Sequence, residues 1–252
     1  MSEKDFKEKD ASNKILSLVS HKLKTPLSII NGYSEAILSQ AGKEKFSPFT
    51  SKALEEINKQ GGKMAELVDK LLNYNKISAM KPADLKKTDI NLKTLVKECA
   101  SRAIAKDDDS AAPAPAASEP AAKRGTYIEI DCSERLSVHA DKEILKAMLE
   151  EMLDNAIKFN NKMEKIIKLQ CANHGDTVSI SVRDYGAGIR PQDVNRIFDP
   201  FYQVDDYFTG QINGWGLGLP MLKNGAELHG GTVNVVSDRG LGSIFTVTLP
   251  IQ

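Results

Sequence analysis

The sequence predicts a multi-domain protein: an all-α helical hairpin that forms a dimeric four-helix bundle, followed by an α+β sandwich domain. Two observations carry this prediction. Apolar residues recur every seven positions within residues 6–41, a spacing typical of helices that share a packing seam. From about residue 89 onward, strand-like and helix-like patterns are joined by short turns, as in α+β folds. A length of 252 residues is enough for two domains.

The hairpin is predicted from two long helical segments, residues 6–41 and 48–79, joined by a turn at 42–45. Pro48 suits the first position of a helix, where its missing N–H costs nothing. One hairpin leaves an apolar stripe uncovered, so we expect a homodimer in which two hairpins cover each other. This domain is expected to span residues 1–82. Its first-helix seam consists of Leu16, Leu23, Ile30 and Ile37, with Val19, Pro26 and Tyr33 between them.

Residues 83–252 are predicted to form the α+β domain, with helices on one face of the sheet. The low-complexity stretch 106–125 has no means of burying apolar surface, so we expect a flexible insertion there. Asp141 is the expected N-cap of a helix that reaches about Asn160. The other expected elements are a strand and a helix over 89–103, strands at 127–132, 165–172, 177–183, 233–236 and 243–249, a helical patch at 191–198 and a helix from Pro220.

Composition narrows the function classes. The 34 basic and 34 acidic residues give a formal net charge of zero, which favours neither nucleic acid nor an anionic membrane surface as a partner. Cys99, Cys132 and Cys171 are widely scattered, so we expect reduced thiols in a cytoplasmic protein. No apolar run approaches the roughly 18 residues of a membrane span, and no signal peptide opens the chain.

Three polar residues of the predicted helix 141–160 share one face. Glu151, Asn155 and Lys158 lie at positions i, i+4 and i+7. A carboxylate, an amide oxygen and an ammonium in one line suit a hydrated Mg²⁺ ion and the phosphates that it carries. The alternative is an ordinary solvated helix face.

Two glycine-rich segments follow. Asp184 ends a predicted strand and precedes Gly186 and Gly188, where a carboxylate can accept a hydrogen bond from an adenine amino group. A plain surface turn is the alternative. The glycines at 214–218 lead directly into a helix, whose N-terminal N–H groups can bind phosphate. Between these segments, Phe198 and Phe201 precede a polar stretch, residues 204–213, that we interpret as a lid or, alternatively, a surface loop.

The order of five motifs resembles the sensor histidine kinases of two-component systems. The motifs are His-x-x-x-Thr-Pro-Leu from His21, Asp-Asn-Ala-Ile-Lys-Phe from Asp154, Asp-x-Gly-x-Gly-Ile from Asp184, Phe-x-Pro-Phe from Phe198 and Gly-x-Gly-Leu-Gly-Leu from Gly214. The resemblance covers nearly the whole chain except 106–125. It implies a dimerisation and phosphotransfer hairpin followed by a Bergerat-type (GHKL) ATP-binding domain.

The resemblance also implies a role for each matching residue. His21 would accept the phosphoryl group, and Thr25 would help to hydrolyse the phosphorylated partner. Asn155 would bind Mg²⁺ with help from Glu151. The positions implied for ATP binding are Asn155, Lys158, Asp184, Gly186, Gly188, Phe198, Phe201, Gly214, Gly216, Leu217 and Gly218. The implied reaction is ATP-dependent autophosphorylation followed by transfer to an aspartate of a response regulator receiver domain. We interpret His139, His174 and His229 as structural.

Two positions depart from the family pattern. Lys22 follows the phosphoacceptor where an acidic residue usually orients the imidazole, and Gln203 stands where an arginine is common. These departures keep open a degenerate, non-catalytic scaffold that binds nucleotide and a partner. An ATPase related to gyrase or the mismatch-repair proteins is a further alternative, which the histidine hairpin disfavours.

Overall fold

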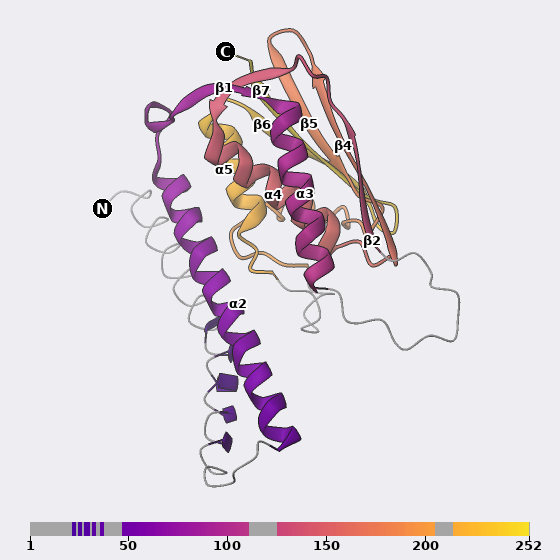
Figure 1. Ribbon diagram of the computed structural model, residues 1–252. Helices are drawn as coiled ribbons and strands as arrows, with labels where there is room; N and C mark the ends of the chain where they lie inside the picture. Colours follow the sequence, from indigo (N-terminus) through magenta and orange to yellow (C-terminus); the bar gives the residue numbers. More distant parts are fainter. Residues whose placement is uncertain are drawn as a thin grey trace. The chain divides into compact units, whose positions relative to one another are not determined.

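The computed structural model describes residues 22–23, 25–26, 28–30, 32–33, 36–37, 47–110, 125–204 and 214–251 (Figure 1). The chain forms two compact units, Met1–Asn73 and Tyr74–Gln252. The domain boundary expected after residue 82 stays a prediction. No helix among the described residues has the length and apolarity needed to cross a membrane.

The second helix of the predicted hairpin is α2, Pro48–Ala79. Ser47 caps it, because the Thr50 N–H donates to Ser47 Oγ at 3.2 Å, and Pro48 occupies the first helical position. The described residues between 22 and 37 are also helical. The predicted turn 42–45, seam residue Leu16 and His21 lie outside the described residues. Four large apolar residues of α2 are exposed in this single chain, as expected of a helix that pairs with a second copy: Phe49, Leu54, Val68 and Leu72.

The second unit is built around a mixed five-stranded sheet in the order β2-β4-β5-β7-β6. Strands β2 and β4 run parallel, whereas the other neighbours are antiparallel. Separately, β1 and β3 form a two-stranded antiparallel sheet. The elements are η1 (Pro82–Asp84), β1 (Lys87–Asn91), α3 (Leu92–Ser110), β2 (Gly125–Asp131), β3 (Ser137–Asp141), α4 (Lys142–Lys158), β4 (Glu164–Asn173), β5 (Thr177–Arg183), α5 (Gly218–Leu228), β6 (Thr232–Asp238) and β7 (Gly242–Pro250).

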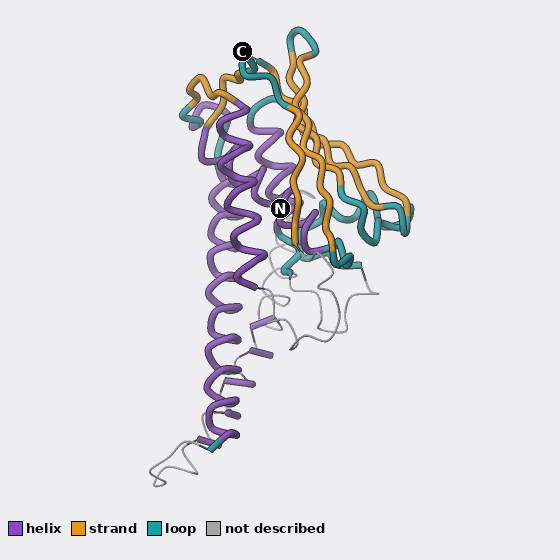
Figure 2. Tube along the Cα trace, turned by 45° about the vertical axis from the view of Figure 1, so that its right-hand side comes forward, coloured by secondary structure: helices purple, strands orange, loops and turns teal. Residues whose placement is uncertain are grey.

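Helices α3, α4 and α5 pack against one face of this sheet, as predicted (Figures 1 and 2). Alternate residues of β4, such as Ile167 and Leu169, point into the core that the helices cover. Helices α3 and α4 run parallel, since their ion pairs advance by four residues on both helices. These pairs are Glu98–Lys146, Arg102–Glu150 and Lys106–Asp154.

Three details of the sequence prediction were wrong. Helix α3 continues to Ser110, so residues 106–110 are helical rather than part of a flexible insertion. Asp107 explains the extension, because its carboxylate accepts hydrogen bonds from Lys165 Nζ and Thr126 Oγ1. Strand β3 was not predicted at all. Residues 191–198 form a series of turns rather than a helix.

His229 joins the end of α5 to the start of α4. Its Nδ1–H donates to the Gly225 carbonyl at 2.7 Å, and its Nε2 accepts the Asp141 N–H at 3.0 Å. Only the neutral ring can make both bonds, and burial lowers the pKa of His229 below its ordinary value. These contacts agree with the interpretation of His229 as a structural residue.

We predict that the second unit loses stability on acidification through His229. Its contribution is complete above about pH 6.5 and is lost as the pH falls through the lowered pKa of the folded state. His229→Ala should cost about 1–3 kcal/mol at pH 7.5, because the buried Asp141 N–H loses its acceptor. It should also flatten the pH dependence between pH 7.5 and 5. Denaturant unfolding followed by fluorescence of Trp215, the single tryptophan, measures both effects.

The matched control is His139→Ala, which removes a partly exposed imidazole and should leave the acid-dependent loss in place. An unchanged pH slope in His229→Ala would contradict the assignment.

Candidate functional site

Helix α4 is anchored firmly before it reaches the candidate site. Asp141 caps it as predicted, since its Oδ1 accepts the N–H groups of Glu143 and Ile144. One face of α4 is apolar and buried: Leu145, Met148, Leu149, Met152 and Ala156. Phe159 is only half-buried and forms the C-cap. The opposite face of α4 is thereby held in a fixed orientation.

Glu151 lies at the N-terminus of α5. Its side chain is 8% exposed, so the solvated-face alternative is wrong for this residue. A methyl group at Gly218, the first residue of α5, would overlap Glu151 Oε2. The carboxylate therefore lies next to the positive end of the α5 dipole.

Lys158 lies beside the first glycine of the same loop. A methyl group at Gly214 would overlap Lys158 Nζ, and this ammonium also lies 4.8 Å from the centre of the Phe159 ring. Asn155 is half exposed between Glu151 and Lys158 on α4. The structure thus brings the three predicted α4 residues and the loop 214–218 to one place.

Asp184 is buried at the end of β5, with 5% of its surface exposed. Its Oδ1 accepts the Gly186 N–H at 2.8 Å, which fixes the orientation of the carboxylate. Burial raises the pKa of Asp184, and backbone N–H donors oppose that shift. A buried, oriented carboxylate is what hydrogen bonding to an adenine amino group requires.

Gly186 brings this turn against the end of α4. A methyl group there would overlap the Phe159 carbonyl oxygen, and the Ala187 N–H donates to that same oxygen at 3.1 Å. Gly188 has a different neighbour. Its φ is +66°, and a methyl group there would overlap the Asp238 carbonyl at the β6–β7 turn. Only glycine suits either position.

The Phe198–Gln203 segment contacts the second glycine loop. The Phe201 N–H donates to the Gly216 carbonyl at 2.8 Å, and Gln203 Nε2 donates to the Gly214 carbonyl at 2.6 Å. Phe201 has a φ of 64°, a left-handed conformation that costs energy in a bulky residue. Phe198 packs on the core, and Leu217 is fully buried.

Sequence reasoning missed Asp193, which holds this segment in place. Its side chain accepts hydrogen bonds from Tyr202 OH and Arg190 Nε, each at 2.6 Å. The Tyr202 hydrogen bond and the Arg190 ion pair lower the pKa of Asp193. Arg196 adds a cation–π contact with the Tyr202 ring at 4.2 Å. The sequence signal that could have identified Asp193 was its position three residues after Arg190, inside the predicted helical patch 191–198.

In the first unit, Thr25 is helical and exposed. Lys22 is half-buried, and burial lowers the pKa of its ammonium group. The position of His21 is not among the described residues.

The residues present fit a magnesium nucleotide. Within the described ranges, no group of three or more His, Cys, Asp or Glu side chains is placed to hold a metal ion. Magnesium does not need one, because it usually keeps several waters and is held by one or two protein oxygens together with substrate phosphates. Asn155 and Glu151 offer such oxygens beside the α5 N-terminus.

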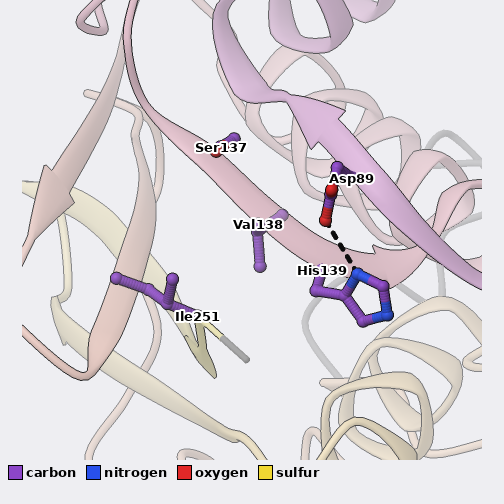
Figure 3. A pocket seen from close by; sticks show the side chains of 5 residues that line it. All are labelled: Asp89, Ser137, Val138, His139 and Ile251. Carbon is purple, nitrogen blue, oxygen red and sulfur yellow. Dashed lines mark hydrogen bonds and ion pairs between the residues drawn. The ribbon is translucent and has the colours of Figure 1, made fainter.

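A separate cavity of about 370 Å³ lies elsewhere, lined by Asp89, Ser137, Val138, His139 and Ile251 (Figure 3). Asp89 Oδ1 and His139 Nδ1 are 2.8 Å apart there. None of the predicted site residues lines this cavity. We therefore assign the candidate site to α4 and the two glycine loops.

Two family profiles match the chain. Residues 11–79 match the His Kinase A (phospho-acceptor) domain. Residues 140–252 match the family described as histidine kinase-, DNA gyrase B-, and HSP90-like ATPase. The second match contains α4 and both glycine loops.

A curated relative is similar to nearly the whole chain. The chain is 30% identical over 250 residues to the sensor-like histidine kinase SenX3 of Mycobacterium tuberculosis, covering 98% of this chain and 56% of SenX3. The chain therefore spans little more than half of that relative.

Two solved structures show the same fold at low sequence identity. Histidine kinase ThkA in complex with response regulator protein TrrA matches with a TM-score of 0.71 and 22% identity, over 98% of this chain and 64% of that one. Full-length ShkA in complex with AMPPNP gives 0.63 and 23%, over 94% and 45%. The two family profiles and the similarity to SenX3 show that the chain carries the phospho-acceptor and ATPase domains of the sensor histidine kinases of two-component systems.

Proposed function

We propose that this chain acts as an ATP-dependent protein histidine kinase that phosphorylates His21 and passes the phosphoryl group to an aspartate of a response regulator. The observation that carries the proposal is the close approach of Gly186, Gly214 and Gly218 to α4. This close approach places the buried Asp184 carboxylate, the Lys158 ammonium and the N-terminus of α5 around one site.

Each group has a role in binding ATP under this proposal. Asp184 accepts a hydrogen bond from the adenine amino group, and Gly186 allows the backbone to approach the ring. Lys158 and the N-terminal N–H groups of α5 bind the phosphates. A bound Mg²⁺ ion, held through Asn155 and Glu151, would neutralise charge on the phosphates.

The chemical step is a phosphoryl transfer. An imidazole nitrogen of His21 attacks the γ-phosphorus, a P–N bond forms, and the bond to the bridging oxygen breaks to release ADP. Catalysis of this kind depends mainly on positioning and charge stabilisation. The phosphoramidate then transfers its phosphoryl group to an aspartate.

The proposed partners are a second copy of this chain and a receiver domain. The exposed apolar residues of α2 and the match to the phospho-acceptor domain support a homodimer. ThkA was solved with a response regulator protein, which supports the same class of partner here. We place the reaction in the cytoplasm, where ATP and receiver domains occur.

The non-catalytic scaffold is the alternative that the experiments below must exclude. Its support was Lys22 and Gln203. Gln203 bonds to the Gly214 carbonyl, so it stabilises the loop rather than offering a cation to the phosphates. The intact His21, Asn155 and Asp184 favour the kinase.

We predict that Asp184→Asn weakens ATP binding by at least about tenfold, which corresponds to about 1.4 kcal/mol, because a charge-assisted hydrogen bond is lost. Titration calorimetry measures the affinity. Asp176→Asn, at the exposed β4–β5 turn, is the matched control and should bind ATP normally. Equal affinities in the two variants would refute the adenine assignment.

We predict that Gly186→Ala also loses more than about tenfold in ATP affinity. Its methyl group must displace the Phe159 carbonyl, and overpacking of this kind costs about 1–3 kcal/mol. Gly61→Ala is the control, because a methyl group there meets no described atom within 4 Å. It should stabilise α2 by up to about 1 kcal/mol and leave ATP affinity unchanged. Normal ATP binding in Gly186→Ala would mean that this turn does not shape the pocket.

The kinase itself is tested by incubation with ATP labelled at the γ-phosphate. We expect an acid-labile, base-stable label that is absent in His21→Gln, whose ATP affinity should be intact. Lys22→Glu should raise the rate of labelling, because a carboxylate can accept the imidazole N–H. Assistance of this kind is worth about 10²-fold or more when complete. ATP binding without any label on the unmodified protein would favour the scaffold instead.

A further inference from the structure

Two of the three cysteines lie side by side at the end of neighbouring strands. The parallel register of β2 and β4 ends with Asp131 opposite Gln170. The next residues are Cys132, the first residue after β2, and Cys171 on β4, so the register brings the two cysteines beside each other. Neighbouring strands lie about 4.7–4.9 Å apart, within the range of about 4.4–6.8 Å between the Cα atoms of a disulfide.

Their side chains point the same way and interact. Both belong to the apolar core on the helix-covered face of the sheet, where Cys132 is 6% and Cys171 is 9% exposed. Each thiol perturbs the pKa of the other, as expected of two neighbouring sulfur atoms. Cys132 in turn donates to the Ser133 carbonyl at 3.8 Å. The strand register and the shared core position therefore bring the two thiols to one place.

We propose that Cys132 and Cys171 are a redox modification site, which a hydroperoxide converts into a reversible disulfide between β2 and β4. The Cys132 sulfur attacks the peroxide, so an S–O bond forms, the O–O bond breaks and one water (or alcohol) leaves. The Cys171 sulfur then attacks the Cys132 sulfur, the S–S bond forms, the S–O bond breaks and a second molecule of water leaves. The two thiol protons leave in the products, and the two electrons lost by the thiols reduce the peroxide.

The surroundings of the two thiols determine which of them reacts first and how fast it reacts. Burial raises the pKa of both thiols, so both are protonated at neutral pH and the reaction is slow. The pKa of Cys132 is raised less than that of Cys171, because the neighbouring Cys171 thiol and the Lys93 ammonium oppose the effect of burial. Asp131 and Glu134 nearby act in the opposite direction. Cys132 is therefore the first nucleophile.

The bond would close a loop that contains β3 and α4. A cross-link of this length restricts the unfolded chain and raises the stability of the folded one. Oxidation should therefore raise the unfolding temperature of the second unit and leave the candidate ATP site formed.

The chain supplies its own control. Cys99, on α3, is buried in the same core, and burial raises the pKa of its thiol to about 11. The groups that act on its pKa are Glu98, Glu150, Lys146 and Arg102 rather than another cysteine. Cys99 is therefore buried like the pair but has different neighbours. Cys99→Ala removes this thiol.

The test treats the full folded chain with hydrogen peroxide, blocks remaining thiols under denaturing conditions and identifies cysteine peptides by mass spectrometry. We expect one dominant disulfide, between Cys132 and Cys171, a blocked Cys99 thiol, and reversal by dithiothreitol. Cys99→Ala should give the same disulfide, and Cys132→Ser should give none. Peroxide treatment in denaturant should instead give all three pairings.

Three blocked thiols after treatment of the folded protein would overturn the proposal. So would a mixture of pairings in the folded protein like that in denaturant. Because the unmodified chain gives the decisive result, a folding defect in Cys132→Ser leaves the test intact. An unfolding temperature that does not rise in the disulfide-containing protein, read from Trp215 fluorescence, would overturn the proposed link to stability.

Discussion

The candidate site depends on how closely two loops approach α4. Gly186 contacts the Phe159 carbonyl, Gly214 contacts the Lys158 ammonium, and Gly218 contacts the Glu151 carboxylate. A methyl group at Gly186 would have to displace backbone, whereas at Gly214 or Gly218 it would have to displace the end of the Lys158 or Glu151 side chain. The apolar face of α4 packs on the sheet, and the N–H of its N-cap, Asp141, donates to His229. These contacts fix the position of the helix. The glycines therefore set the distance between the groups that would hold adenine and those that would hold phosphate.

The local features of the fold were predictable from the sequence. Asp141 as N-cap, Pro48 at the start of α2 and the glycines ahead of α5 are signals written in adjacent residues. Most site residues followed from the same local patterns and from the family resemblance. Glu151 and Asn155, for example, share a face simply because they are four residues apart on a helix.

The features that were missed depend on contacts between distant segments. Strand β3 is short and is stabilised by pairing with β1, from Lys87 opposite Asp141 to Asn91 opposite Ser137. Helix α3 extends past residue 105 because Asp107 meets Lys165 on β4. Asp193 matters through Tyr202, nine residues away. Cys132 and Cys171 are far apart in the sequence, and it is the register of β2 and β4 that makes them neighbours.

The departures from the family pattern bear on the chemical step more than on the nucleotide site. Gln203 ties the Phe198–Gln203 segment to the glycine loop, and Phe201 holds a strained backbone conformation beside Gly216. Both contacts join the two ends of residues 204–213, next to Lys158. A site organised in this way should still bind ATP, whatever the rate of transfer to His21.

The most direct test of the proposed nucleotide site is amide hydrogen exchange, measured with and without a magnesium ATP analogue that is not hydrolysed. Slower exchange should appear in residues 184–188 and 214–218, whose amides surround the proposed nucleotide. The β4–β5 turn at 173–176 should exchange at the same rate in both samples. Protection centred on that turn, or at the Asp89–His139 cavity, with no change in the glycine loops, would contradict the proposed site.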